Sequence, residues 1–119
     1  MRIRRALPSD AAGIVAVLNA IAAERIHSAI DCVWTIETEE RYLESLSPRE
    51  VVHVVIDDAH RLVGLPIFDR WSSMLNSMAR VGQVGTFLLP EWRRRGVGRQ
   101  LWNVTVTFAR DAGYRKIVI

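Results

Sequence analysis

The segment from Val81 to Ile119 constrains the fold most, because it combines a strand, a basic glycine turn, a long helix and a second strand. Apolar residues recur at steps of three and four beyond Gly96, and Gly113 is placed to end the helix they predict. They are Val97, Leu101, Val104, Phe108 and Ala112. Val81 to Leu89 and Lys116 to Ile119 flank this helix with strand composition. A right-handed crossover follows, in which the two strands lie parallel.

Two further helices are predicted in the first half of the chain. Ile3 to Ala6 has strand composition, and Ser9 or Asp10 is placed to cap the helix that comes next. The apolar stripe of that helix is Ile14, Val17, Leu18 and Ile21. We expect the second helix to begin at Thr38 as its cap and to end at Ser47, because Pro48 cannot continue it.

A hairpin is predicted between the second helix and the glycine turn. Val51 to Ile56 is apolar on both faces, which is typical of a strand covered on both sides. Asp57 to Arg61 predicts a turn, so Leu62 to Phe68 should pair back antiparallel. Because Pro66 cannot donate to a ladder, we expect a bulge or an edge-like position there. Trp71 to Arg80 is predicted as a loop, and the whole is a mixed, mostly antiparallel α/β sheet flanked by helices.

Composition favours one cytoplasmic domain over residues 1–119. Half of the residues are hydrophobic, and the chain has no repeat or low-complexity linker. The apolar runs are far shorter than the ~20 residues of a membrane span, so we expect no membrane partner. Cys32 is the only cysteine, which excludes an internal disulfide and a multi-cysteine zinc site.

The positive charge of the chain is concentrated in one place. The net charge is +3, and removing four clustered arginines from that total leaves −1. These are Arg93, Arg94, Arg95 and Arg99. Arginine suits planar, multidentate contact with phosphate. A nucleic-acid partner would need basic residues spread over a face, so we expect none.

The turn that carries these arginines is suited to an anion. Gly96 and Gly98 let backbone N–H groups approach a phosphate, and the helix N-terminus adds a partial positive charge. Leu101 stands where the dinucleotide fingerprint needs Gly or Ala, and no Gly-Lys-Ser/Thr occurs, so Rossmann and Walker loops are excluded. Arg93, Gly96 and Gly98 resemble the motif Arg/Gln-x-x-Gly-x-Gly/Ala of the GNAT N-acetyltransferases. Residues 5–10, Arg-Ala-Leu-Pro-Ser-Asp, also resemble the start of that family.

The resemblance implies a GNAT fold with acetyl-CoA as acetyl donor and an amine as acceptor. It implies that the basic turn holds the pyrophosphate, through Arg93, Arg94, Arg95, Gly96, Val97, Gly98 and Arg99. It also implies that the backbone of Leu88 and Leu89 pairs with pantetheine and the thioester, one amide acting as oxyanion donor.

The catalytic base is not evident from the resemblance. Many members carry a glutamate on the strand before the turn, and residues 84–88 contain none. The candidates are Asp69, Glu37, Glu40, His53 and Glu91. We rank Asp69 first because it follows a strand that runs toward the sheet centre. His53 lies among valines, which favours a core role, and the glutamates are typical of first turns or surfaces.

The family pattern continues beyond this chain through a helix and two further strands, so we expect a C-terminally truncated domain. One hypothesis is therefore a catalytically degenerate module that binds coenzyme A without turnover. Lys116 to Ile119 forms an apolar strand with an uncovered edge, and such edges favour pairing. We accordingly predict a homodimer through this strand.

Overall fold

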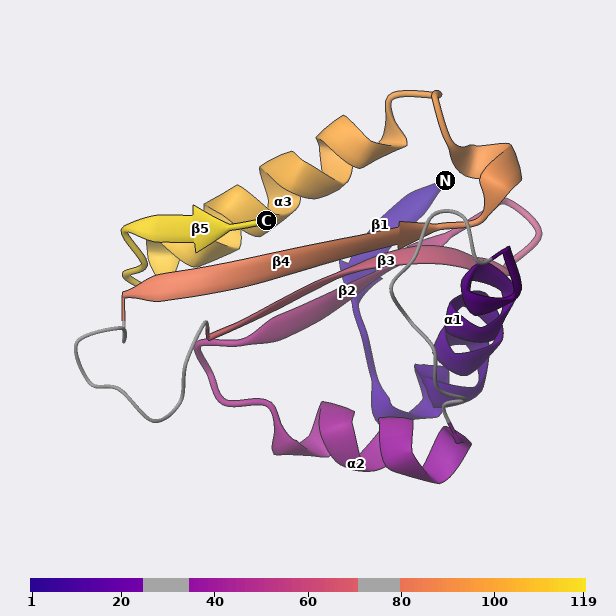
Figure 1. Ribbon diagram of the computed structural model, residues 1–119, viewed down its shortest axis with the longest axis horizontal. Helices are drawn as coiled ribbons and strands as arrows, with labels where there is room; N and C mark the ends of the chain where they lie inside the picture. The colour runs from indigo at the N-terminus through magenta and orange to yellow at the C-terminus, as the bar shows by residue number, and fades with distance from the viewer. Residues whose placement is uncertain (25–34, 71–79) are drawn as a thin grey trace.

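Five strands form one sheet in the order β1-β2-β3-β4-β5 (Figure 1). The computed structural model describes residues 1–24, 35–70 and 80–119. Its strands are β1 (Arg2–Arg5), β2 (Val51–Ile56), β3 (Leu62–Arg70), β4 (Val81–Leu88) and β5 (Lys116–Val118). Its helices are η1 (Pro8–Asp10), α1 (Ala11–Glu24), α2 (Ile36–Ser45), η3 (Pro90–Trp92) and α3 (Val97–Asp111).

The pairing of the strands confirms the predicted mixed sheet. The first four strands pair antiparallel in sequence order, and β4 pairs parallel with β5 across the α3 crossover. The parallel ladder joins residues 81–83 of β4 to residues 116–118 of β5. Because β4 runs on to Leu88, its last five residues pair with β3 only, within the described part of the chain.

Helices cover both faces of the sheet: α1 and α2 lie on one face, and α3 lies on the other (Figure 1). Leu65 and Ile67 of β3 pack on the α1 and α2 side. Phe68 packs on the α3 side, where Ala109 and Tyr114 meet it. Since side chains alternate along a strand, Asp69 shares the α1 and α2 face.

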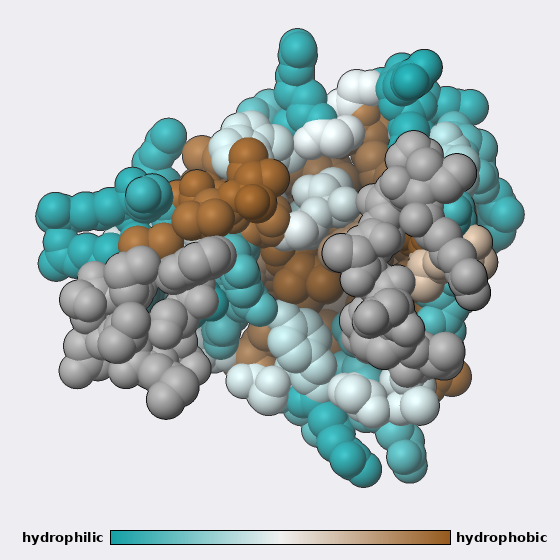
Figure 2. All heavy atoms as spheres, in the orientation of Figure 1, coloured by the Kyte–Doolittle hydropathy of each residue, from teal (hydrophilic) through white to brown (hydrophobic). Residues whose placement is uncertain are grey.

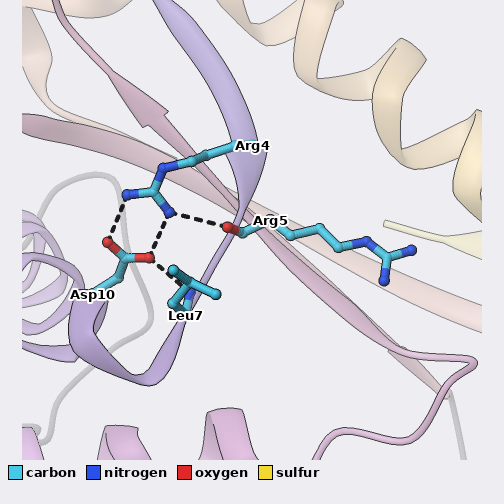
Figure 3. A network of polar contacts seen from close by, with 4 residues as sticks. All are labelled: Arg4, Arg5, Leu7 and Asp10. Atoms are coloured by element: carbon cyan, nitrogen blue, oxygen red, sulfur yellow. Dashed lines mark hydrogen bonds and ion pairs between the residues drawn. The ribbon is translucent and has the colours of Figure 1, made fainter.

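The start of α1 differs from the prediction. Neither Ser9 nor Asp10 is a simple N-cap, because both lie in the short helix η1 that leads into α1. The Asp10 carboxylate accepts the N–H of Leu7 at 2.7 Å and two hydrogen bonds from Arg4, at 2.8 and 2.9 Å (Figure 3). The Arg4 guanidinium lowers the pKa of Asp10. This network ties β1 to the first helix.

The second helix also begins earlier than expected. Its N-cap is Thr35, whose hydroxyl oxygen accepts the N–H of Thr38 at 3.2 Å. The prediction of Thr38 as cap was therefore wrong by one turn, because a threonine capable of capping stands three residues upstream. The helix ends at Ser45, since Leu46 is already extended, with ψ of 131°.

Pro66 lies in the central strand of the sheet rather than at an edge. It pairs with Thr86 of β4, and the β2–β3 ladder has an irregularity at Val55 and Ile56. The extra residue is Val63 of β3, which has no partner in β2, so the bulge lies three residues before Pro66 and not at it. The expected edge-like position is wrong. Because β3 pairs on both sides, the missing N–H of Pro66 costs the sheet one possible hydrogen bond.

The predicted loop from Trp71 and the position of Cys32 lie largely outside the described residues. Within the described ranges, no helix is long and apolar enough to cross a membrane.

Candidate donor site and acceptor side

The turn between β4 and α3 has two left-handed residues. Arg94 has φ of 62°, and Gly96, the N-cap of α3, has φ of 79°. Glycine adopts the second conformation without steric cost. A Cβ at Gly96 or at Gly98 would meet no atom within 4 Å, so the space beside both glycines is open.

The amides at the start of α3 are available to a ligand. The first backbone bond of the helix is from the Gln100 N–H to the Gly96 carbonyl, at 3.3 Å. The N–H groups of Val97, Gly98 and Arg99 have no backbone acceptor among the described residues. The side chain of Val97 is buried with Leu101 in a cluster that includes Val55 and Val63 of the sheet, and this packing holds the first turn of α3 in place. Three amides and the positive end of a 15-residue helix thus converge on one point.

Three of the four clustered arginines surround these amides as exposed cations. Arg94, Arg95 and Arg99 form no ion pair within the part of the chain that the structure describes. Arg95 stacks on the ring of Trp92, with 5.4 Å from its guanidinium carbon to the ring centroid. The turn therefore presents positive charge that no carboxylate of the described residues neutralises.

Arg93 is different. Its guanidinium donates two hydrogen bonds of 2.9 Å to the carboxylate of Glu24, the last residue of α1. Its Nε donates to the carbonyl of Leu88 at 3.1 Å. The carboxylate raises the pKa of Arg93. The first residue of the motif is thus engaged within the protein.

The pairing of β3 with β4 decides which backbone groups of β4 point away from β3. The Leu89 N–H donates to the Val63 carbonyl at 3.0 Å, so this pair is hydrogen-bonded across the two strands. Hydrogen bonding alternates along an antiparallel ladder, which makes Gly64–Leu88 and Pro66–Thr86 the non-bonded pairs. The backbone groups of Thr86 and Leu88 therefore point away from β3, beyond the end of the β5 ladder. Both backbone groups of Leu89 are used within the protein, its carbonyl accepting from Trp92.

An open hollow of about 250 Å³ adjoins this strand end. Ile21 of α1 and Arg93 line it together with three residues of β4, which are Thr86, Phe87 and Leu88. The hollow joins the free edge of β4 to the Arg93–Glu24 pair.

Asp69 lies on the α1 and α2 face of the sheet, next to the place where β4 and β5 part. It pairs across the strands with Gln83, the last residue of β4 that pairs with β5. The Tyr42 hydroxyl of α2 donates to the Asp69 carboxylate at 3.2 Å. Burial and the charge of Asp69 raise the pKa of Tyr42, so the phenol stays protonated.

The other candidate bases lie elsewhere. His53 is buried on the α3 face, edge-on to Phe108, and burial lowers its pKa. This confirms a core role for it. Glu37, Glu40 and Glu91 are exposed, as their surface interpretation predicted.

Sequence reasoning did not identify Glu24, Tyr42 or the backbone of Thr86 as parts of the site. Tyr42 and Glu24 reach partners 27 and 69 residues away, which no local pattern reveals. The direction of the Thr86 backbone depends on the register of β3 with β4, which no local pattern reveals either.

The comparisons agree with the geometry. The family model described as Acetyltransferase (GNAT) family matches residues 18–119. No curated protein matches the chain significantly in sequence. A GNAT acetyltransferase from Streptococcus pneumoniae is 20% identical with a TM-score of 0.88, over 98% of this chain and 71% of that one. A phosphinothricin acetyltransferase from Sinorhizobium meliloti, in complex with acetyl-CoA, is 16% identical with a TM-score of 0.86, over 98% and 63%.

A GCN5-related N-acetyltransferase from Kribbella flavida is 22% identical with a TM-score of 0.81, over 98% of this chain and 68% of that one. These likenesses confirm the predicted fold. The family match covers more than half of the chain and confirms the predicted acetyl-CoA-dependent acyltransferase class. This chain belongs to the GNAT family of acetyltransferases.

Proposed function

We propose that this chain transfers an acetyl group from acetyl-CoA to a primary amine of a small molecule or a peptide. The observation that carries the proposal is the turn, where three unpaired amides of α3 and three unneutralised arginines among the described residues face open space. A pyrophosphate fits this set, because it offers several acceptor oxygens and two negative charges. Arg94, Arg95 and Arg99 supply the matching charge.

The pantetheine arm would run along the free edge of β4. The backbone groups of Thr86 and the N–H of Leu88 point to that side, and the hollow of about 250 Å³ adjoins them. A backbone N–H aimed at the thioester oxygen stabilises the negative charge that develops as the amine attacks. The N–H of Leu88 suits this role better than that of Leu89, which is bonded to Val63.

Asp69 is the proposed base. An amine attacks as the neutral base, so its ammonium form must first lose a proton. Asp69 pairs with Gln83, five residues or about 16 Å along β4 from Leu88, so the carboxylate would accept that proton through a chain of waters. The Tyr42 hydroxyl holds the carboxylate in place. Thr86 is exposed, but its hydroxyl cannot act as a base.

The test is thiol release from acetyl-CoA in the presence of a panel of primary amines. Transfer to at least one amine supports the proposal, and Asp69→Asn should lower kcat by roughly 100-fold. Glu40→Gln, which changes an exposed carboxylate of the neighbouring helix, should keep the wild-type rate. Binding of coenzyme A without thiol release on any amine would favour the alternative, a catalytically degenerate coenzyme A module.

We also propose that two copies associate through β5. Ile119 is 93% exposed, and Ile117 and Val118 beside it are only partly buried. Figure 2 shows apolar side chains gathered over this strand. β5 is the last strand of the described sheet, and an apolar sheet edge favours pairing with another chain.

A further inference from the structure

Arg93 and Glu24 form a partly buried pair at one wall of the hollow. Their side chains are 29% and 22% exposed, and both guanidinium Nη atoms contact the carboxylate. The third hydrogen bond of Arg93, to the Leu88 carbonyl, fixes the end of β4. One side chain thus joins three parts of the molecule, which are the last residue of α1, the last residue of β4 and the start of the turn.

The charges of this pair cancel locally. A bidentate arginine–carboxylate contact uses the N–H groups at the edge of the guanidinium that would otherwise bind phosphate. Arg94, Arg95 and Arg99 keep their charge facing outward, within the described residues. The arginine run therefore divides into one neutralised member beside the hollow and three cations beside the helix N-terminus.

We infer that Arg93, held by Glu24, is a positioning residue that shapes the wall of the pantetheine slot, and that it is not a ligand of the phosphates. This inference rests on the proposed function. It differs from the role that the motif resemblance implied, in which Arg93 grips the pyrophosphate with its neighbours. A neutral wall suits pantetheine, which carries amides and a thiol but no charge.

The experiment compares two ligands, coenzyme A and pantetheine, which lacks every phosphate. Affinities are measured by calorimetry for the first and by NMR titration for the second. Arg93→Gln and Glu24→Gln should each weaken both ligands by a similar factor, about five- to tenfold, because both variants disturb the end of β4. Arg95→Gln is the matched control: it should weaken coenzyme A by about tenfold and leave pantetheine within twofold.

Two further readouts separate a positioning role from a general loss of structure. The double variant Glu24→Gln with Arg93→Gln should bind no more weakly than either single variant, because the two residues act as one unit. The salt dependence of coenzyme A affinity should stay unchanged in Arg93→Gln and become shallower in Arg95→Gln. If Arg93→Gln folds poorly, Arg93→Lys takes its place, because lysine keeps the charge but lacks the planar fork of donors. Arg93→Lys should then weaken coenzyme A and pantetheine by a similar factor.

The inference is overturned if Arg93→Gln weakens coenzyme A much more than pantetheine. It is also overturned if Glu24→Gln tightens coenzyme A, since a released guanidinium would then be serving the phosphates. Failure of the wild-type chain to bind coenzyme A at all is a different result, because it removes the proposed function itself.

Discussion

Single residues decide which backbone groups of β4 can meet a ligand. The bond from the Leu89 N–H to the Val63 carbonyl fixes the alternation of the ladder, so the backbone groups of Thr86 and Leu88 face outward. A shift of one residue would reverse this direction. The donor site therefore depends on register as much as on the motif.

Gly82 supports that register, because its lack of a side chain admits Phe68. A Cβ at this position would lie 2.3 Å from Cζ and 2.5 Å from Cε1 of the Phe68 ring, which is fully buried. Gly82→Ala should destabilise the fold by about 1–3 kcal/mol through overpacking. Urea unfolding measures this loss. Gly98→Ala is the control, since a Cβ there meets no atom within 4 Å, and it should not lower the stability.

The motif residues were predictable from the sequence to different extents. Gly96 and Gly98 were placed correctly at the start of α3, because glycine spacing after a strand has a local cause. The partner of Arg93 was not predictable, since Glu24 meets it only after α1 has packed on the sheet. Trp102 is 38% exposed, whereas Leu101 beside it is buried. Successive side chains of a helix point in different directions, so Leu101 faces the sheet and Trp102 does not.

Whole elements were predicted better than their ends. All five strands, the three long helices and the parallel β4–β5 pair follow from periodicity and crossover geometry. The starts of α1 and α2 depend on which nearby side chain accepts the free N–H groups. Asp10 accepts from Arg4 and from the Leu7 N–H, and Thr35 caps α2 three residues before Thr38. Several residues at each end could cap, and only the folded arrangement selects one.

The link between β1 and α1 gives a pH-dependent prediction. The Arg4 hydrogen bonds lower the pKa of Asp10 in the folded state, so the carboxylate stabilises the fold above its unfolded pKa of about 4. This contribution is lost as the pH falls through the lower, folded value. Asp10→Asn should therefore cost about 1 kcal/mol at pH 7, a figure kept small because Arg4 is partly exposed. Urea unfolding at several pH values should show the difference from wild type shrink below about pH 4.

A contrary result is easy to recognise. A difference between Asp10→Asn and wild type that stays constant from pH 7 to pH 3 would mean that the charge of Asp10 does not contribute.

At the scale of the whole molecule, the two proposed functional regions lie at opposite ends of the part of β4 that extends beyond β5. The donor turn lies at the end of β4, and Asp69 lies beside the last paired residue, Gln83. The cytoplasmic location and the dimer stay predictions, because neither depends on contacts within one chain. The fold itself agrees with GNAT structures at TM-scores of 0.81 to 0.88 for the three compared above.

The dimer prediction can be tested through β5. Sedimentation at micromolar concentration should give twice the mass of one chain. Ile117→Lys with Ile119→Lys should shift the population to monomer, because charge on an apolar edge opposes pairing. Ile36→Lys, which places the same charge at an exposed apolar position of α2, should leave the dimer intact. A wild-type monomer at this concentration would contradict the prediction.

The most direct test of the central claim is calorimetric titration of coenzyme A into the wild-type chain and into the double variant Arg95→Glu with Gly98→Asp. Both substitutions place negative charge at the turn where the α3 amides converge, and Gly98 has open space for a side chain. We expect micromolar binding by the wild type and a loss of at least about 100-fold in the variant, with thermal unfolding of the free proteins little changed. Equal affinity of the two folded proteins for coenzyme A would contradict the claim that this turn binds the donor.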